Sequence, residues 1–182
     1  MNKIKMITFD LDDTLWDNRP TIINAEIETR KWIEDRVGKI KWGDLNDFLN
    51  LRKELIKKDE SIEWDIGKLR KEIFKEKLKH IRPTSLRNQI VNDAFEIFID
   101  KRHLIKLYDG VEDSLKILSK KYELGVLTNG NADIYKFEIG RYFKFSISSL
   151  EAKDNKPNRS HFDEASKKLE GIKFDEMLHI GD

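Results

Sequence analysis

Two carboxylates stand two residues apart at the end of an apolar run near the start of this chain. The apolar run, residues 4–9, predicts a short buried strand, and Asp10 and Asp12 follow where it ends. At the carboxyl end of a parallel strand, a side chain meets the crevice in which open α/β sheets bind ligands. This stretch therefore favours a parallel sheet with a binding site at that end.

Taken alone, residues 9–15 fit a simple turn equally well, because acidic and hydroxyl residues after a strand also cap turns. A calcium loop fails, since its pattern requires Asn or Asp at Thr14 and Gly at Leu15. Three more polar signals follow apolar runs downstream, and their order favours a catalytic site: Thr128-Asn129-Gly130, Lys156-Pro157 and His179-Ile180-Gly181-Asp182.

The composition excludes several classes of protein. Lys and Arg number 35 against 34 Asp and Glu, and the formal net charge of +1 argues against nucleic acid or an anionic membrane as the main partner. The absence of cysteine excludes disulfides and thiolate metal sites. No apolar run approaches the ~20 residues that span a bilayer, and no signal-peptide segment precedes the first strand. We therefore expect a cytoplasmic protein with no membrane partner.

Residues 17–106 contain four amphipathic helical patterns in succession. Three helices are expected at residues 18–37, 44–58 and 62–80. A fourth helix is expected from a continuous apolar stripe over residues 86–98. Four such helices in a row predict a small bundle.

Beyond this segment, helical and strand patterns alternate. The expected elements are a helix at 111–121, a strand at 124–127, a helix ending near Ile139, a strand at 143–148, a helix at 160–169 and a strand at 177–180. This alternation predicts an α/β fold with a doubly wound, parallel, Rossmann-like sheet. The core domain is then residues 1–16 and 107–182. The bundle, residues 17–106, is a cap inserted after the first strand and is expected to lie over the crevice.

Five polar side chains would converge at one end of such a sheet: Asp10, Asp12, Thr128, Lys156 and Asp182. Carboxylates about 4 Å apart repel by roughly 4 kcal/mol per pair at an effective dielectric constant near 20, and a divalent cation relieves that repulsion. Because the available ligands are all oxygen, Mg²⁺ is favoured over zinc. Thr128, with neighbouring backbone N–H groups, and Lys156 can bind phosphate oxygens, so the site suits a phosphoryl group.

These residues resemble the haloacid dehalogenase-like superfamily of phosphohydrolases. The family pattern is D-x-D-x-T at the first strand, a Thr or Ser after the second, a downstream Lys and a final acidic motif. The sequence matches it with Asp10-Leu11-Asp12-Asp13-Thr14, Thr128-Asn129-Gly130, Lys156-Pro157 and Gly181-Asp182. The resemblance covers essentially the whole chain, and the helical insertion falls where the family places its cap.

The resemblance implies a phosphatase in which Asp10 attacks phosphorus to form an aspartyl-phosphate, while Asp12 protonates the leaving oxygen and then activates water. Mg²⁺ would be held by the carboxylates of Asp10 and Asp182 and the backbone carbonyl of Asp12. The residues that would bind the substrate phosphate are Thr128, Asn129 and Lys156. Dehalogenases of the family lack an acid at the position of Asp12, because their leaving group needs no proton.

The expected substrate is a small phosphorylated metabolite. Residues 12–20 and 128–132 resemble the branch that dephosphorylates flavin mononucleotide and the ribitylaminouracil phosphate of riboflavin synthesis. A sugar-phosphate or nucleotide phosphatase, a phosphomutase and a non-catalytic binding module derived from the family stay open. A phosphoacceptor signalling domain would need neither the acid at Asp12 nor the large insertion.

Three further expectations concern structure rather than chemistry. The tryptophans and His179 are assigned to packing. Asp13 is assigned a structural role. The family normally continues beyond the Gly-Asp motif with another acid, a helix and an edge strand, so we expect the core domain to be truncated at its C-terminus.

Overall fold

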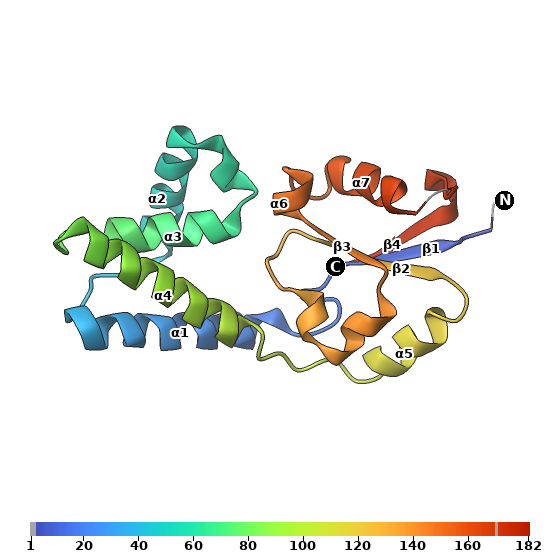
Figure 1. Cartoon of the computed structure of the whole chain (residues 1–182), viewed down its shortest axis with the longest axis horizontal. Helices are drawn as coiled ribbons and strands as arrows, with labels where there is room; N and C mark the ends of the chain where they lie inside the picture. The colour runs from blue at the N-terminus through green and yellow to red at the C-terminus, as the bar shows by residue number, and fades with distance from the viewer. Residues whose placement is uncertain (1–2, 170) are drawn as a thin grey trace. The chain divides into compact units, whose positions relative to one another are not determined.

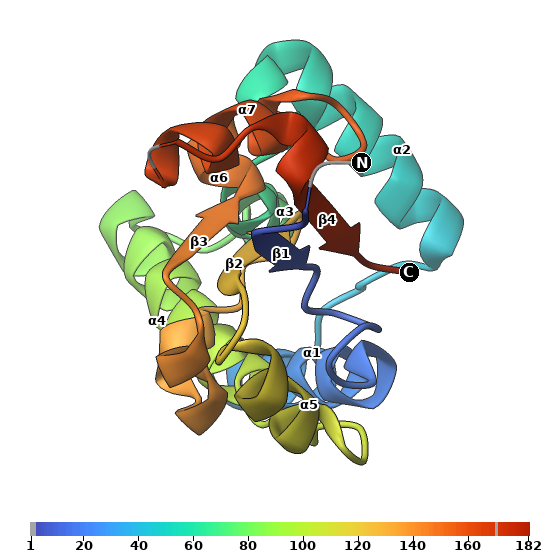
Figure 2. The same ribbon diagram turned by 90° about the vertical axis from the view of Figure 1, so that its right-hand side faces the viewer.

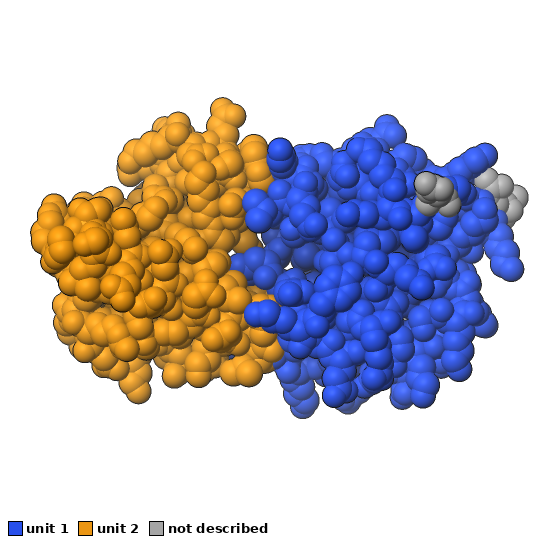
Figure 3. Space-filling view, viewed as in Figure 1, with its two compact units in different colours: residues 1–20, 105–182 blue, residues 21–104 orange. Residues whose placement is uncertain are grey.

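The computed structural model describes residues 3–169 and 171–182 and divides the chain into two compact units (Figure 3). Unit 1 comprises Met1–Pro20 and Ile105–Asp182, and unit 2 comprises Thr21–Leu104. The helical segment is therefore inserted between the two parts of the unit that carries the acids. Its limits lie a few residues from those expected from the sequence.

Unit 1 contains a four-stranded parallel sheet in the order β3-β2-β1-β4 (Figure 1). The strands are β1 (Met6–Phe9), β2 (Glu123–Thr128), β3 (Phe145–Ser148) and β4 (Met177–Ile180). β1 pairs with two strands that are distant in the sequence, so it occupies an inner position of the sheet. β1 and β2, which are buried and paired on both edges, read as short apolar runs, which is why the sequence located them.

Helices cover both faces of this sheet (Figure 2). One face packs against α5 (Val111–Leu118) and the 3₁₀ turns η2 (Ile134–Lys136) and η3 (Glu138–Tyr142). The other face packs against α6 (Ser149–Ala152) and α7 (Ser160–Lys168). Successive side chains of β1 alternate between these layers, as strand geometry requires. The predicted doubly wound α/β fold is confirmed.

Unit 2 is built from four α-helices and a 3₁₀ turn. They are α1 (Asn18–Val37), α2 (Leu45–Lys58), η1 (Glu60–Glu63), α3 (Ile66–Lys77) and α4 (Thr84–Arg102). One apolar cluster joins α1, α3 and α4 around Ile33 and Phe74. A second joins α2, η1 and α3 around Leu55 and Leu69. These clusters give unit 2 an apolar core of its own, and the predicted helical insertion is confirmed.

The helix expected over residues 62–80 is wrong in its first part, where the chain forms η1 and then begins α3 at Ile66. The side chain of Asp65 accepts a hydrogen bond from the N–H of Lys68 at 2.8 Å and so caps α3. An N-cap residue has a non-helical backbone, so a continuous helix cannot pass through it.

The helix expected to end near Ile139 is also wrong. The segment forms η2 and η3, separated by Phe137 with an extended backbone. A Cβ on Gly140 would lie 2.6 Å from the carbonyl oxygen of Ile134, so the two turns pack more closely than a side chain would allow. The short α6 was not expected, although its capping box of Ser148 and Glu151 is a local signal for a helix start.

Across the part of the chain that the structure describes, no helix is long and apolar enough to cross a bilayer.

Candidate active site

Asp10 lies immediately beyond β1, at the carboxyl end of the sheet. Its N–H donates to the carbonyl oxygen of Ile180 at 2.8 Å, which extends the pairing of β1 and β4 by one residue. Its Oδ1 accepts a hydrogen bond from the N–H of Leu11 at 2.8 Å. The side chain is 17% exposed, so the carboxylate is fixed in orientation and still reachable.

Lys156 is the charge partner of Asp10. Its Nζ lies 3.0 Å from Asp10 Oδ2, and its side chain is only 10% exposed. Breaking such a pair by removing one partner costs about 3–5 kcal/mol, because the other charge is left largely buried. Replacing either residue would therefore leave the other charge buried and unpaired. The two residues are 146 positions apart in the chain.

Asn129 holds the backbone of Lys156 with both atoms of its side-chain amide. Nδ2 donates to the carbonyl oxygen of Lys156 at 3.1 Å, and Oδ1 accepts from the N–H of Lys156 at 2.7 Å. The hydroxyl of Ser149 in turn donates to the carbonyl oxygen of Asn129 at 3.2 Å. These contacts join the end of β2 to the loop that carries the lysine. Sequence reasoning missed this role, because no local pattern indicates that a side-chain amide forms hydrogen bonds with a residue 27 positions further along the chain.

Asp154 organises the same loop from within. Its carboxylate accepts hydrogen bonds from the N–H of Asn155 at 2.8 Å, Nδ2 of Asn158 at 2.7 Å and the hydroxyl of Ser160 at 2.6 Å. The bond from Ser160 and then that from Asn158 lower the pKa of Asp154, since both favour the charged carboxylate. The sequence marked this stretch only as a polar loop.

Asp12 is oriented by the apolar core. Its Oδ1 accepts a hydrogen bond at 2.9 Å from Nε1 of Trp16, whose side chain is fully buried. The intervening turn is tight, and Asp13 has a φ of 58°. The Asp13 carboxylate accepts from the N–H of Asn18 at the start of α1, 2.9 Å away. Asp12 is thus held by a rigid partner, while Asp13 supports the chain's exit from the turn.

Thr128 is the last residue of β2, and its side chain is buried. Its Oγ1 accepts from the N–H of Gly130 at 2.9 Å, which shapes the turn after the strand. Its carbonyl oxygen lies 3.2 Å from Nε2 of His161 on α7. Because a carbonyl can only accept, Nε2 carries the proton, and Nδ1 is buried with no partner among the described residues. Burial accordingly lowers the pKa of His161.

His179 on β4 has a packing environment. Its Nδ1 lies 2.9 Å from the hydroxyl of Thr8, and its ring meets Phe162 edge-on with centroids 5.4 Å apart. Burial, followed by the nearby positive charge of Lys156, lowers the pKa of His179. A neutral ring held between β1 and α7 fits the packing role expected from the sequence.

Asp182 follows β4 and forms no hydrogen bond or ion pair with another described residue. Its charge is one of three that raise the pKa of Tyr108, after burial itself and together with Asp17 and Asp13. Gly181 brings this segment close to β1, because a Cβ there would lie 3.3 Å from Cβ of Asp10. The structure thus joins Asp10 to Lys156 and Lys156 to Asn129, and no hydrogen bond links Asp182 to Asp10.

The donor set of the expected metal site is made of oxygen only. Over the described ranges, no three His, Cys, Asp or Glu side chains lie close enough together to hold a metal ion. The expected set of Asp10, Asp12 and Asp182 needs just two carboxylates, since Asp12 would contribute its backbone carbonyl. Carboxylate and carbonyl oxygens suit Mg²⁺, which keeps several water ligands, so the chemistry of these residues fits that ion.

The sequence matches a known protein family. A family model described as haloacid dehalogenase-like hydrolase matches residues 4–182. The chain belongs to the haloacid dehalogenase-like hydrolases. Membership confirms the resemblance inferred from the four motifs.

Individual relatives carry two kinds of activity in their names. The chain is 30% identical over 183 residues to 5-amino-6-(5-phospho-D-ribitylamino)uracil phosphatase YigB of Escherichia coli strain K12, covering all of this chain and 76% of the relative. It is 32% identical to 2-haloacid dehalogenase from Pseudomonas syringae pv. Tomato DC3000, with a TM-score of 0.88 over 98% of this chain and 78% of that one. A haloacid dehalogenase-type phosphatase from Thermococcus onnurineus shares the fold, with 20% identity and a TM-score of 0.65 over 98% and 77% of the two chains.

The buried His161 predicts that stability falls in mild acid. Its folded-state pKa is lowered from an ordinary value of 6.5, so stability is fully present above that value and is lost as the pH falls toward the folded-state pKa. His161→Gln, which keeps a donor for the Thr128 carbonyl, should flatten the fall in urea midpoint between pH 8 and pH 5. The matched control is His80→Gln, an exposed position, which should leave the curve unchanged. An equal slope in wild type and His161→Gln would contradict the assignment.

Proposed function

We propose that this chain is a Mg²⁺-dependent phosphatase that hydrolyses a small phosphorylated metabolite through an aspartyl-phosphate. The pairing of Asp10 with Lys156 at the end of β1 carries this proposal, because it combines an oriented nucleophile with a cation that can also bind a phosphate oxygen. The second acid, Asp12, stands two residues away. Similarity to a named phosphatase over the full length of the chain supports the same reaction class.

In the first step, a carboxylate oxygen of Asp10 attacks phosphorus, and the bond from phosphorus to the ester oxygen breaks. Asp12 donates its proton to the departing alkoxide, and the bond from Trp16 Nε1 to its Oδ1 orients the carboxyl group. In the second step, Asp12 takes a proton from water as that water attacks the aspartyl-phosphate. Phosphate leaves, and both carboxyl groups regain their starting states.

The other residues stabilise charge and geometry. Lys156 offsets negative charge on Asp10 before attack and on the phosphoryl group during transfer. Thr128 and the backbone N–H groups after β2 would bind phosphate oxygens. Mg²⁺, held by Asp10, Asp182 and the Asp12 carbonyl, would supply further charge neutralisation when bound. Because both amide atoms of Asn129 are engaged by Lys156, we propose that Asn129 acts by holding that lysine.

For the substrate, we propose a phosphate ester of the flavin pathway, of the kind named for the relative from Escherichia coli. The resemblance of residues 12–20 and 128–132 to that branch supports the same choice. Sugar phosphates and nucleotides are the alternatives that a substrate panel separates.

Dehalogenation of a 2-haloacid is the second candidate, favoured by the 32% identity to the dehalogenase from Pseudomonas syringae. The acid at Asp12 argues against it. A halide leaves without a proton, so a dehalogenase gains nothing from a general acid beside its nucleophile.

The first prediction from this proposal tests the reaction class. The chain should release phosphate from a panel of phosphorylated metabolites with Mg²⁺, lose activity in excess chelator and regain it when Mg²⁺ is added. Asp10→Asn should abolish release, because the amide is a poor nucleophile. Asp13→Asn, a neighbouring isosteric change at a position where Asn tolerates the positive φ, should retain activity. Full activity in chelator would remove the metal from the mechanism, and chloride release from 2-chloropropionate without phosphate release would favour dehalogenation.

The second prediction isolates Asp12. Asp12→Asn keeps an acceptor for Trp16 Nε1 but has no carboxyl proton to give. Its kcat/KM, which reports transfer to Asp10 and not the later hydrolysis step, should fall by about 10²–10⁴ on alkyl phosphates, the usual contribution of general acid catalysis, and much less on p-nitrophenyl phosphate. Steady-state kinetics on the two substrate types measures the difference. Equal losses on both would argue against Asp12 as the general acid.

The third prediction separates two roles for Asn129. If it acts through Lys156, Asn129→Ala should lower kcat/KM by about tenfold, and the double variant Asn129→Ala/Lys156→Met should be no worse than Lys156→Met alone. Ser149→Ala, which removes the hydroxyl bond to the Asn129 carbonyl, should have a smaller effect. Fully additive losses, with weaker binding of inorganic phosphate, would indicate direct phosphate binding by Asn129 instead.

A further inference from the structure

A cavity of about 520 Å³ lies within unit 2, between α1, the N-terminal part of α2 and α3. Its volume falls in the range of roughly 300–1,000 Å³ typical of small-molecule sites. Most of its lining is apolar and includes the aromatic rings of Trp42, Phe48 and Phe74. Phe48 is 40% exposed, whereas Phe74 is fully buried, so the lining runs from the surface to the core of the unit.

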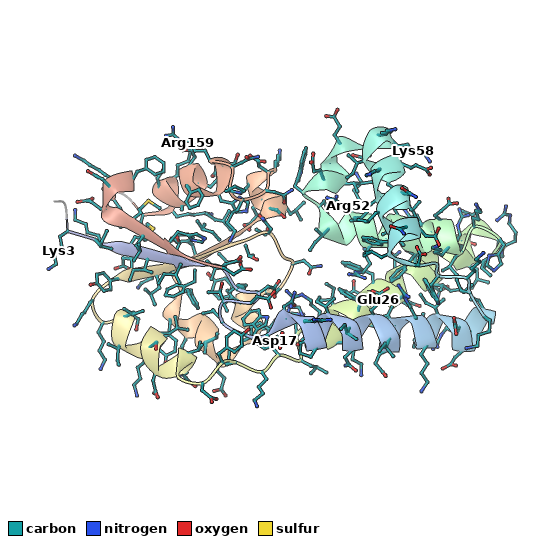
Figure 4. The ribbon with its side chains drawn as sticks, turned by 180° about the vertical axis from the view of Figure 1, so that it is seen from behind. Lys3, Asp17, Glu26, Arg52, Lys58 and Arg159 are labelled. Carbon is teal, nitrogen blue, oxygen red and sulfur yellow. The ribbon has the colours of Figure 1, made fainter. Side chains whose placement is uncertain are left out.

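Two arginines place positive charge on this apolar lining. Arg30 on α1 donates through Nε to one carboxylate oxygen of Glu26 at 2.8 Å, and Arg70 on α3 donates through Nη1 to the other. Figure 4 labels Glu26, which projects from α1. Both oxygens of the single carboxylate are thus engaged, and two guanidinium groups share one negative charge.

The charge around the cavity does not balance. Lys77 and Asp44 also line it and have opposite signs, so one positive charge remains in excess. Burial lowers the pKa of Arg70, and the nearby charges of Arg30 and Arg102 act in the same direction. A guanidinium in such surroundings gains when a further anion approaches, because charges attract more strongly at a partly buried protein site than in bulk water.

Arg30 and Arg70 also retain N–H groups that can donate further hydrogen bonds. Each guanidinium has five N–H groups, and Arg30 and Arg70 each spend one hydrogen bond on Glu26 and none on any other described residue. Stacking fixes their planes: the Cζ of Arg30 lies 4.9 Å from the ring centroid of Trp42, and that of Arg70 lies 3.5 Å from the centroid of Phe98. Fixed planes present their remaining donors in a fork that matches a carboxylate or similar anion.

We propose that this cavity binds a flat aromatic anion, with its charged group on Arg30 and Arg70 and its ring against the aromatic lining. Neutral apolar molecules would leave the excess positive charge unpaired, and small inorganic anions would leave the apolar volume unfilled. A ligand with both parts satisfies both features. The site involves none of the residues assigned to phosphate hydrolysis, so it stands whether or not the chain is a phosphatase.

The test uses 2-naphthoate as the probe, titrated calorimetrically into the full chain. Its neutral counterpart, 2-naphthamide, should bind at least about tenfold more weakly, because it cannot form charge-assisted bonds to both arginines. Chemical shifts of backbone amides should change on α1 and α3 and at the indole of Trp42. No binding of naphthoate at millimolar concentration, or equal binding of the amide, would overturn the proposal.

Matched variants test whether Arg30 and Arg70 bind the carboxylate of the probe. Arg70→Met should weaken naphthoate binding by about tenfold or more and abolish the preference over the amide. Arg30→Met should act in the same direction and, with its side chain more exposed, carries the test if the Arg70 variant fails to fold. The control is Arg36→Met, on the same helix and also stacked on a tryptophan, with Cζ 3.7 Å from the Trp32 centroid, but outside the cavity lining. An equal loss in the Arg36 variant would overturn the assignment.

A last comparison separates this site from the one at Asp10. Asp10→Asn should leave naphthoate affinity unchanged. A change of naphthoate affinity in this variant would place the probe at the Asp10 site and overturn the proposal. Because the readout is binding, absence of phosphatase activity in the chain would not affect the result.

Discussion

The ion pair between Asp10 and Lys156 is the interaction on which the geometry of the site depends. A carboxylate and an ammonium group can be largely buried only when their positions are fixed and their remaining lone pairs and N–H groups form hydrogen bonds. β1 and the N–H of Leu11 fix the acid. The amide of Asn129 fixes the backbone of the lysine. The pairing of β1 with β2 brings these two sets of contacts together, so the sheet and the charge pair support each other.

Much of unit 1 could be predicted because its signals are local. Apolar runs located the strands, and the polar residues that follow them located one end of the sheet. The loop conformation could not be predicted, because the partner of Asn129 depends on where the chain returns after β3. Asp182 was expected beside Asp10, and the structure supports that neighbourhood only through the close approach of Gly181.

The errors in helix assignment have specific physical causes. Residues 62–80 carry a continuous helical periodicity, yet the cap formed by Asp65 interrupts the helix within it. Residues up to Ile139 have enough apolar character for a helix, yet the tight approach of Gly140 to Ile134 selects two 3₁₀ turns. In both places a single residue outweighed a periodic pattern. The charge imbalance of the cavity in unit 2 was likewise invisible in the sequence, where the overall charge is close to neutral.

The insertion of unit 2 after β1 has a consequence for synthesis on the ribosome. Thr21–Leu104 is continuous and precedes β2, so all of its residues emerge before those of β2. β1 emerges earliest and must wait for a neighbour that is more than a hundred residues away, and for β4 longer still. Domains made of continuous chain can fold during translation, whereas distant strand pairs first require closure of a long loop. The helical unit is therefore expected to be folded on the nascent chain while the strand that carries the two acids is still unpaired.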